Sequence, residues 1–291
     1  MKKYSQYLNR DSVSVFLLHG VISKQKWKVR NATRKHILAS EFKSFCKDLR
    51  NKGEAIGIGS VLSTVNGADS FPRKAFCLTF DDGFENNYTI AADILDDLKI
   101  PCTFYITTGF IGTDEVSWTD RIERVLEASN TAVAPRISLM RDLRTLLKAS
   151  KEIDPVAFAQ RFEKSFNLPI LKERELDAKL NWKQVKELPG SGLFTRSGLF
   201  TIGGHGHTHR ILSFLSGIDL NQEISRSIAL IESNTGIRIR HYSYPEGMEN
   251  CWSDAVIQTL QAHGIQSAVL AYPGPNKRGT DPFRIHRIMV E

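Results

Sequence analysis

Cysteine is scarce in this chain of 291 residues, and no two cysteines form a Cys-x-x-Cys pair. The cysteines stand far apart, at Cys46, Cys77, Cys102 and Cys251. Scattered cysteines without such a pair, three of them in apolar surroundings, favour unpaired thiols inside the protein. We therefore predict buried free thiols, which suit a reducing compartment.

Long hydrophobic runs are also missing. The apolar stretch VSVFLL (residues 13–18) is too short for a membrane span or for the core of a signal peptide, and no small-residue cleavage site follows it. We therefore expect a cytoplasmic protein without a transmembrane segment.

The chain is basic, with a net charge of +7 and a pI of about 9.2. Such a balance favours anionic partners, among them phosphorylated metabolites and the acidic headgroups of a membrane surface. No nucleic-acid-binding motif is present, so we expect no nucleic-acid partner. The densest basic stretch, residues 23–36, predicts either a solvated loop or a rim that attracts phosphate.

Strand and helix patterns alternate along the chain. This alternation predicts an α/β protein with a parallel sheet. The expected strands cover residues 13–20, 74–80, 102–107, 198–204, 237–245, 266–272 and 282–290, and the expected helices cover 40–52, 86–99, 219–236 and 253–264. Between about 110 and 190 the alternation weakens, and helical patterns at 120–129, 154–166 and 180–188 indicate an insertion.

Polar residues follow four of the expected strands, at the end where such folds carry their chemistry. They are His19, the pair Asp81-Asp82, the cluster His205, His207 and His209, and the stretch YPEG at 244–247. Asp-Asp-Gly is also a common turn sequence. Two carboxylates at a strand end nevertheless have a chemical use, because one can bind a cation while the other acts as a base.

The histidine cluster predicts a metal site. His205 and His209 are four residues apart, which places both rings on one face of a helical turn, whereas His207 points elsewhere. Two imidazoles and one aspartate make three protein ligands and leave a position for water, as catalytic zinc sites require. A polar loop with satisfied histidines is the alternative.

The motifs TFDDG (79–83) and HGHTH (205–209) resemble the first two signatures of the polysaccharide deacetylases, carbohydrate esterase family 4. SYPEG (243–247) resembles a variant of the third. The resemblance implies a distorted (β/α) barrel and a single catalytic domain over 1–291, with a helical insertion at about 110–190. It also implies a zinc ion, or another divalent transition metal.

The family's residue roles carry over position by position. Asp81 matches the general base, and Asp82 matches the metal ligand that acts with His205 and His209. The family's last motif, a Leu-x-His whose histidine is the general acid, lies near the N-terminus in a permuted branch, and LLHG here places His19 at that position. His286 in RIHR competes with it, but it falls inside an expected strand.

The third motif departs from the family pattern, which is often Arg-x-Pro-Tyr-Gly. Ser243 replaces the arginine that steadies the base, and Glu246 replaces the tyrosine. The backbone N–H of Glu246 can still serve the oxyanion, because a backbone donor does not depend on the side chain. We expect Arg287, in the last strand, to supply the missing guanidinium, and Tyr244 and Pro245 to complete the substrate site.

These residues predict a metal-dependent hydrolase that removes an N-acetyl or other N-acyl group from an amino sugar. The expected substrate is a sugar nucleotide or a lipid-linked glycan precursor, whose phosphates suit the basic charge. Trp118, Tyr244 and Trp252 are candidates for stacking against sugar rings. A deformylase, an amidase acting on a non-sugar amide, and an inactive carbohydrate-binding homologue remain the alternatives.

Overall fold

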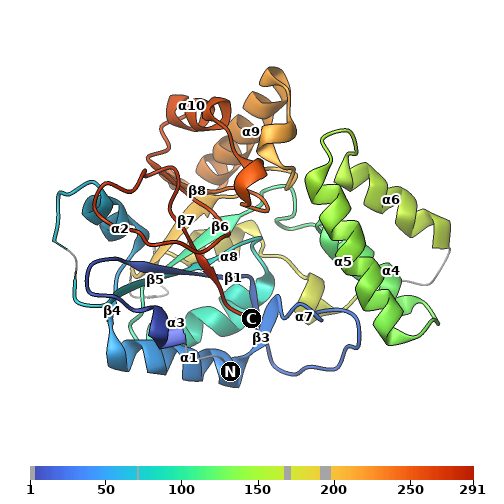
Figure 1. The fold of residues 1–291 in the computed structure, drawn as a ribbon, viewed down its shortest axis with the longest axis horizontal. Helices are drawn as coiled ribbons and strands as arrows, with labels where there is room; N and C mark the ends of the chain where they lie inside the picture. The colour runs from blue at the N-terminus through green and yellow to red at the C-terminus, as the bar shows by residue number, and fades with distance from the viewer. Residues whose placement is uncertain (1–3, 71, 167–171, 191–197) are drawn as a thin grey trace.

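A parallel sheet runs through the centre of the molecule (Figure 1). The computed structural model describes residues 4–70, 72–166, 172–190 and 198–291. The main sheet has eight strands in the order β10–β1–β5–β6–β7–β8–β9, with β4 paired to β5, and all pairs are parallel. The strands are β1 (Ser14–Leu18), β4 (Glu54–Ala55), β5 (Ala75–Phe80), β6 (Cys102–Ile106), β7 (Phe200–Gly204), β8 (His241–Ser243), β9 (Ser267–Val269) and β10 (Ile288–Met289).

The sheet curls, and the last segment of the chain, which includes β10, lies between β9 and β1 and contacts both. Leu270 N–H donates to the carbonyl of Ile285 at 2.8 Å, beside β9, and Val290 N–H donates to the carbonyl of Leu17 in β1 at 2.9 Å. The α/β class and the distorted barrel expected from the sequence are therefore confirmed. The expected strand 282–290 is mostly irregular, because only Ile288–Met289 pairs as a strand.

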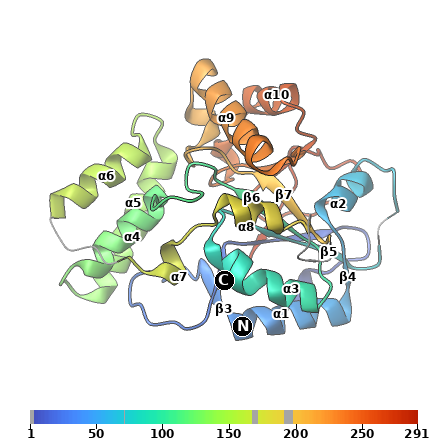
Figure 2. The same cartoon turned by 180° about the vertical axis from the view of Figure 1, so that it is seen from behind.

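Helices surround the sheet, and Figures 1 and 2 show α1 and α3 on one side with α9 and α10 on the opposite side. The expected helix 86–99 begins as a π-helical turn, Asn87–Ala91, and continues as α3. The small sheet of β2 (Gly20–Ile22) and β3 (His36–Leu38) was not expected. The helices are α1 (Ala39–Lys52), α2 (Ile58–Val65), α3 (Ala92–Asp97), α4 (Trp118–Ala128), α5 (Val133–Ala149), α6 (Pro155–Phe166), α7 (Arg174–Asp177), α8 (Trp182–Glu187), α9 (Gly217–Thr235) and α10 (Asp254–Ala262).

The central strands are buried on both faces. Every residue of β1, β5 and β6 is buried, as their near-continuous apolar sequences require in a parallel sheet covered by helices. Phenylalanine rings fill one side, where Phe80 stacks on Phe104 with 5.5 Å between ring centroids. The four cysteines are buried free thiols, as predicted.

Helices α4, α5 and α6 pack together beside the barrel in both views (Figures 1 and 2). Their shared apolar cluster includes Trp118, Ile122, Met140, Leu147 and Ala159. Helix α5 was not among the expected helices; Pro135 lies in its first turn, where proline is tolerated. Throughout the described residues, every helix is too short or too polar to cross a bilayer.

Candidate metal centre and active site

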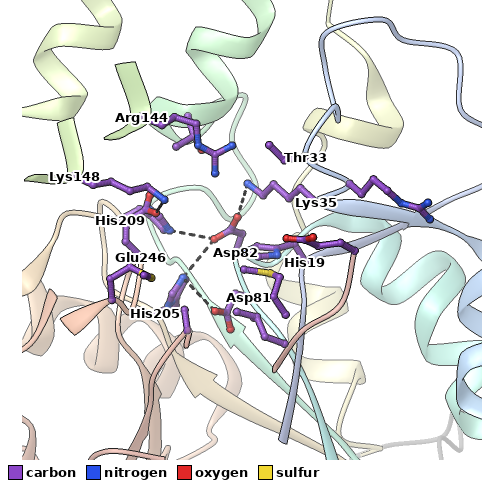
Figure 3. A pocket seen from close by; sticks show the side chains of 17 residues that line it. His19, Thr33, Lys35, Asp81, Asp82, Arg144, Lys148, His205, His209 and Glu246 are labelled. Carbon is purple, nitrogen blue, oxygen red and sulfur yellow. Dashed lines mark ion pairs between the residues drawn. The ribbon is translucent and has the colours of Figure 1, made fainter. Parts of the chain in front are cut away.

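A cavity of about 230 Å³ opens where the strands end (Figure 3). His19 follows β1, Asp81 and Asp82 follow β5, and His205 follows β7, and all four line this cavity. The parallel strands bring these residues together because their carboxyl ends meet at one edge of the sheet. His209 and Glu246, from the loops after β7 and β8, also line the cavity.

Three of these side chains form a ligand set. The Nε2 atoms of His205 and His209 lie 3.4 and 3.2 Å from Oδ1 of Asp82, and the three ligand atoms all fall within 4.8 Å of one another. Ligands about 2.05 Å from a tetrahedral zinc ion stand about 3.3 Å apart. Oδ1 of Asp82 is buried and has no hydrogen-bond partner among the described residues. The residues therefore fit Zn²⁺ or another divalent transition metal.

Hydrogen bonds outside the ligand set fix its orientation. Nδ1 of His205 lies 2.9 Å from the carbonyl oxygen of Ser243, so this nitrogen carries the proton and Nε2 keeps its lone pair for a metal. Nζ of Lys35 lies 2.8 Å from Oδ2 of Asp82, the oxygen that faces away from the histidines. Burial raises the pKa of Asp82, but Lys35, His205 and His209 outweigh burial and hold it well below its usual value.

The backbone is strained where the cavity is built. Asp82, His209 and Glu246 have φ angles of 73°, 59° and 64°, in the left-handed region that few residues other than glycine adopt. Such conformations cost about 1–3 kcal/mol each and persist where the surrounding structure enforces them, often at functional sites.

A buried arginine holds the neighbouring aspartate. Nη1 and Nη2 of Arg287 donate to Oδ1 and Oδ2 of Asp81 at 2.8 and 2.7 Å. Ser243 joins the group, because its hydroxyl donates to Oδ2 of Asp81 at 3.0 Å and accepts from Nη2 of Arg287 at 2.9 Å. Burial raises the pKa of Asp81, but Arg287 and His205 outweigh burial and lower it overall. The guanidinium missing from the third motif is thus supplied to Asp81 from the last segment of the chain.

His19 lies in the same cavity, and His286 is not among its lining residues. Burial is the main reason that the pKa of His19 falls to about 4, while Asp82 and Asp81 act in the opposite direction. His286 instead packs edge-on against Tyr272, with 5.2 Å between ring centroids.

His207 stands apart from the ligand set. Its Nδ1 lies 3.0 Å from the hydroxyl of Thr108, and the residue lines a second cavity together with Trp118. Glu223 organises this loop by accepting hydrogen bonds from the N–H groups of His207 and Thr208, at 2.7 and 2.6 Å. The histidine loop therefore turns His205 and His209 toward the cavity and His207 away from it.

The residues after β8 divide between core and cavity. The ring of Tyr244 is fully buried and its hydroxyl donates to the carbonyl of Phe283, so the expected stacking of this ring on a sugar is wrong. Pro245 is buried against the histidine loop, close to Gly206. Glu246 lines the cavity. Trp252 lies outside the cavity, with its ring 4.3 Å from the guanidinium carbon of Arg284.

Three basic residues that line the cavity were not predicted from the sequence. Lys35 belongs to the basic stretch at residues 23–36, but the sequence of this stretch does not predict the contact of Lys35 with Asp82. Arg144 and Lys148 line the cavity from helix α5, which was not expected. Lys35 also lies 3.2 Å from Asp120 in helix α4, so the helical insertion contacts the metal site through a buried chain of charges.

The fold is an α/β barrel, and Asp82, His205 and His209 form an arrangement that could hold a metal ion at the ends of its strands. The chain belongs to the polysaccharide deacetylase family, whose model matches residues 68–134 and 168–268, more than half of the sequence. A search of the curated proteins gives no match.

Solved structures of deacetylases share the fold. IcaB from Ammonifex degensii aligns with a TM-score of 0.65 at 18% identity, over 97% of this chain and 92% of that chain. PplD from Streptococcus pyogenes, solved in complex with acetate, gives 0.62 at 14% identity, over 97% and 93%. The BpsB deacetylase domain from Bordetella bronchiseptica gives 0.59 at 18% identity, over 97% and 98%. At these identities, the likeness concerns the fold.

Proposed function

We propose that this protein is a metal-dependent hydrolase that removes the N-acetyl group from an amino sugar. The observation that carries the proposal is the pairing of two adjacent aspartates with different partners. Asp82 faces His205 and His209 as a metal ligand, while Asp81 is held by Arg287 and stays outside the ligand set. Membership of the polysaccharide deacetylase family supports the same chemistry.

Several residues of the cavity have distinct proposed roles in the hydrolysis. A bound Zn²⁺ would polarise the acyl carbonyl and acidify water. Asp81, ionised beside Arg287, takes the proton of the attacking water. The N–H of Glu246 stabilises the oxyanion, since among the described residues it donates to no other acceptor.

His19 is the proposed acid. It protonates the departing amine nitrogen, so that water and the amide become acetate and a free amine. With a pKa of about 4 the ring is neutral at pH 7 in the free protein. It must therefore take up a proton during the reaction, before the amine leaves.

The proposed substrate is a phosphorylated precursor in the cytoplasm, either a sugar nucleotide or a lipid-linked glycan. The net charge of +7 and the basic residues that line the cavity, among them Arg34, Lys35, Arg144 and Lys148, support an anionic substrate. Acidic headgroups could hold the protein at a membrane surface that carries a lipid-linked substrate. We also propose that residues 1–291 form one catalytic domain with its helical insertion.

Acid release from a panel of substrates tests this function. N-acetylated sugar nucleotides, lipid-linked sugars and neutral polymers are each incubated with the zinc-loaded protein, and acetate and formate are measured by NMR. We expect acetate from the phosphorylated precursors, loss of activity with a chelator and recovery when zinc is restored. Asp81→Asn should lower the rate by about 10²–10⁴-fold while zinc remains bound.

Three results would contradict the proposal in different ways. Formate as the product would identify a deformylase. Release from polymers but not from phosphorylated precursors would refute the proposed substrate. If no substrate of the panel releases acid although zinc is bound, the protein acts on another amide or is an inactive homologue.

A further inference from the structure

Helix α5 places two cations over the metal centre. Arg144 and Lys148 are four residues apart, so they share one face of the helix, and both line the cavity with Asp82 and His209. In Figure 3 the side chains of Arg144 and Lys148 extend into the cavity from the side opposite Asp81. Residues 135–167, which include most of α5, fall between the two segments matched by the family model. This part of the cavity is therefore a feature of this chain that the family match does not account for.

The cations of the cavity differ in how well they are paired. Nζ of Lys148 lies 2.5 Å from Oε2 of Glu246, and Nζ of Lys35 lies 2.8 Å from Oδ2 of Asp82. Nη2 of Arg34 lies 2.6 Å from Oε2 of Glu41. Each of these cations therefore has a close carboxylate partner within the protein.

Arg144 is different. Among the described residues, its single hydrogen bond runs from Nη1 to Oε1 of Glu123 at 3.4 Å, a long contact for a group with five N–H donors. Its side chain is only 21% exposed. The side chain is thus partly buried, and most of its N–H donors make no hydrogen bond with the described residues.

A second polar group lining the cavity has unused hydrogen-bonding capacity. The hydroxyl of Thr33 is buried and makes no hydrogen bond with the described residues, and Thr33 lines the same cavity as Arg144. In Figure 3 Thr33 and Arg144 lie on the same side of the cavity, above Lys35 and Asp82. Both residues therefore line one side of the cavity with donors or acceptors that the described residues do not satisfy.

We propose that Arg144 and Thr33 form a binding subsite for an oxyanion, either a phosphate or a carboxylate carried by the substrate next to its acetamido group. A guanidinium binds both anions through two parallel hydrogen bonds. A neutral sugar hydroxyl would leave the guanidinium with only its long contact to Glu123, so the subsite favours anionic sugars. The proposal rests on the proposed deacetylase function and names the substrate class for that site.

Matched ligands test the subsite directly. N-acetylglucosamine, its 1-phosphate and the corresponding uronic acid are titrated by calorimetry into zinc-loaded Asp81→Asn protein, which does not consume them. We expect at least one anionic sugar to bind about tenfold or more tightly than the neutral sugar, as charged hydrogen bonds imply. Preference for the phosphate or for the acid identifies the source of the oxyanion.

Variants assign the preference to Arg144. Arg144→Gln, in the Asp81→Asn protein, should bring the affinity ratio of anionic to neutral sugar close to one, and Thr33→Val should lower it by a smaller factor. Arg144→Lys keeps the charge without the planar fork and should give an intermediate ratio. Arg141→Gln removes a charge from an exposed position one turn earlier in α5 and should leave the ratio unchanged. Thermal unfolding monitored by circular dichroism confirms that each variant is folded.

Binding and turnover separate the two proposals. Equal affinities for neutral and anionic sugars, or a ratio unchanged in Arg144→Gln, would overturn the subsite even if acetate is released from all three sugars. A preference that depends on Arg144, without acetate release by the unmodified protein, would support the subsite and refute the proposed function.

Discussion

The buried pair of Arg287 and Asp81 offers the sharpest test of the site. Arg287 is fully buried and donates to both oxygens of Asp81. It also donates to Leu270 O at 2.6 Å, Thr79 Oγ1 at 3.1 Å and Ser243 Oγ at 2.9 Å. Removing one partner of a buried ion pair costs about 3–5 kcal/mol, because the other charge stays buried without compensation. Arg287→Met should therefore lower the free energy of unfolding by about that amount.

The effect of Asp81→Asn should change sign with the background. In the unmodified protein the substitution leaves the guanidinium of Arg287 unpaired, and it should be destabilising. In the Arg287→Met background it removes an unpaired buried carboxylate, and it should raise the free energy of unfolding by about 1–3 kcal/mol. A double-mutant cycle thus measures the coupling between the two charges.

Urea unfolding followed by circular dichroism measures these free energies. All proteins are kept in chelator, because a metal that binds only the folded state would add its own stabilisation. Arg284→Met is the matched control, since this arginine lies in the same segment with a side chain 42% exposed and ion pairs at the surface. It should cost about 1 kcal/mol or less. If Asp81→Asn destabilises both backgrounds equally, the ion pair does not hold Asp81 and the reasoning is wrong.

Three further predictions concern the metal and the acid. His207→Ala should reduce zinc affinity, measured by competition with a chromogenic chelator, far less than His205→Ala or His209→Ala; equal losses would refute the ligand assignment. Lys35→Met should weaken zinc binding by about 10–100-fold because Asp82 loses its support, and Lys35→Arg should restore part of it; unchanged affinity in Lys35→Met would show that Lys35 does not position the ligand. His19→Gln should lower kcat for acetate release by about 10²–10⁴-fold with zinc affinity within a few-fold, and a full rate would transfer the acid role to another group.

The sequence predicts the parts of the fold whose signals are local. β1, β5 and β6 are near-continuous apolar runs, and α9 and α10 have clear periodicity, so their positions follow from the chain itself. The direction of a parallel sheet then places the residues after each strand at one edge. Asp81, Asp82, His205 and His209 are adjacent in space for this reason.

The missing parts depend on contacts between distant segments. β3 has three residues and is a strand only because β2 pairs with it. Nothing in the residues around Arg144 and Lys148 distinguishes them from the polar face of any helix, and only the packing of α5 beside the barrel turns them toward the cavity. The strand pattern of residues 282–290 does not predict whether the side chain of Arg287 faces the core. In the structure it does, because Arg287 donates a hydrogen bond to the buried Asp81.

The pairing of β1 with β10 also has a consequence for how the protein is made. Phe16 pairs with Ile288, and almost the whole chain lies between them. During synthesis β1 leaves the ribosome long before β10. The backbone groups of β1 that pair with β10 therefore stay unpaired until the end of the chain has been made. A contact of such sequence separation forms slowly, because a very large loop has to close first. The segment that completes the barrel also carries Arg287, so we expect the ion pair between Arg287 and Asp81 to be among the last contacts to form during folding.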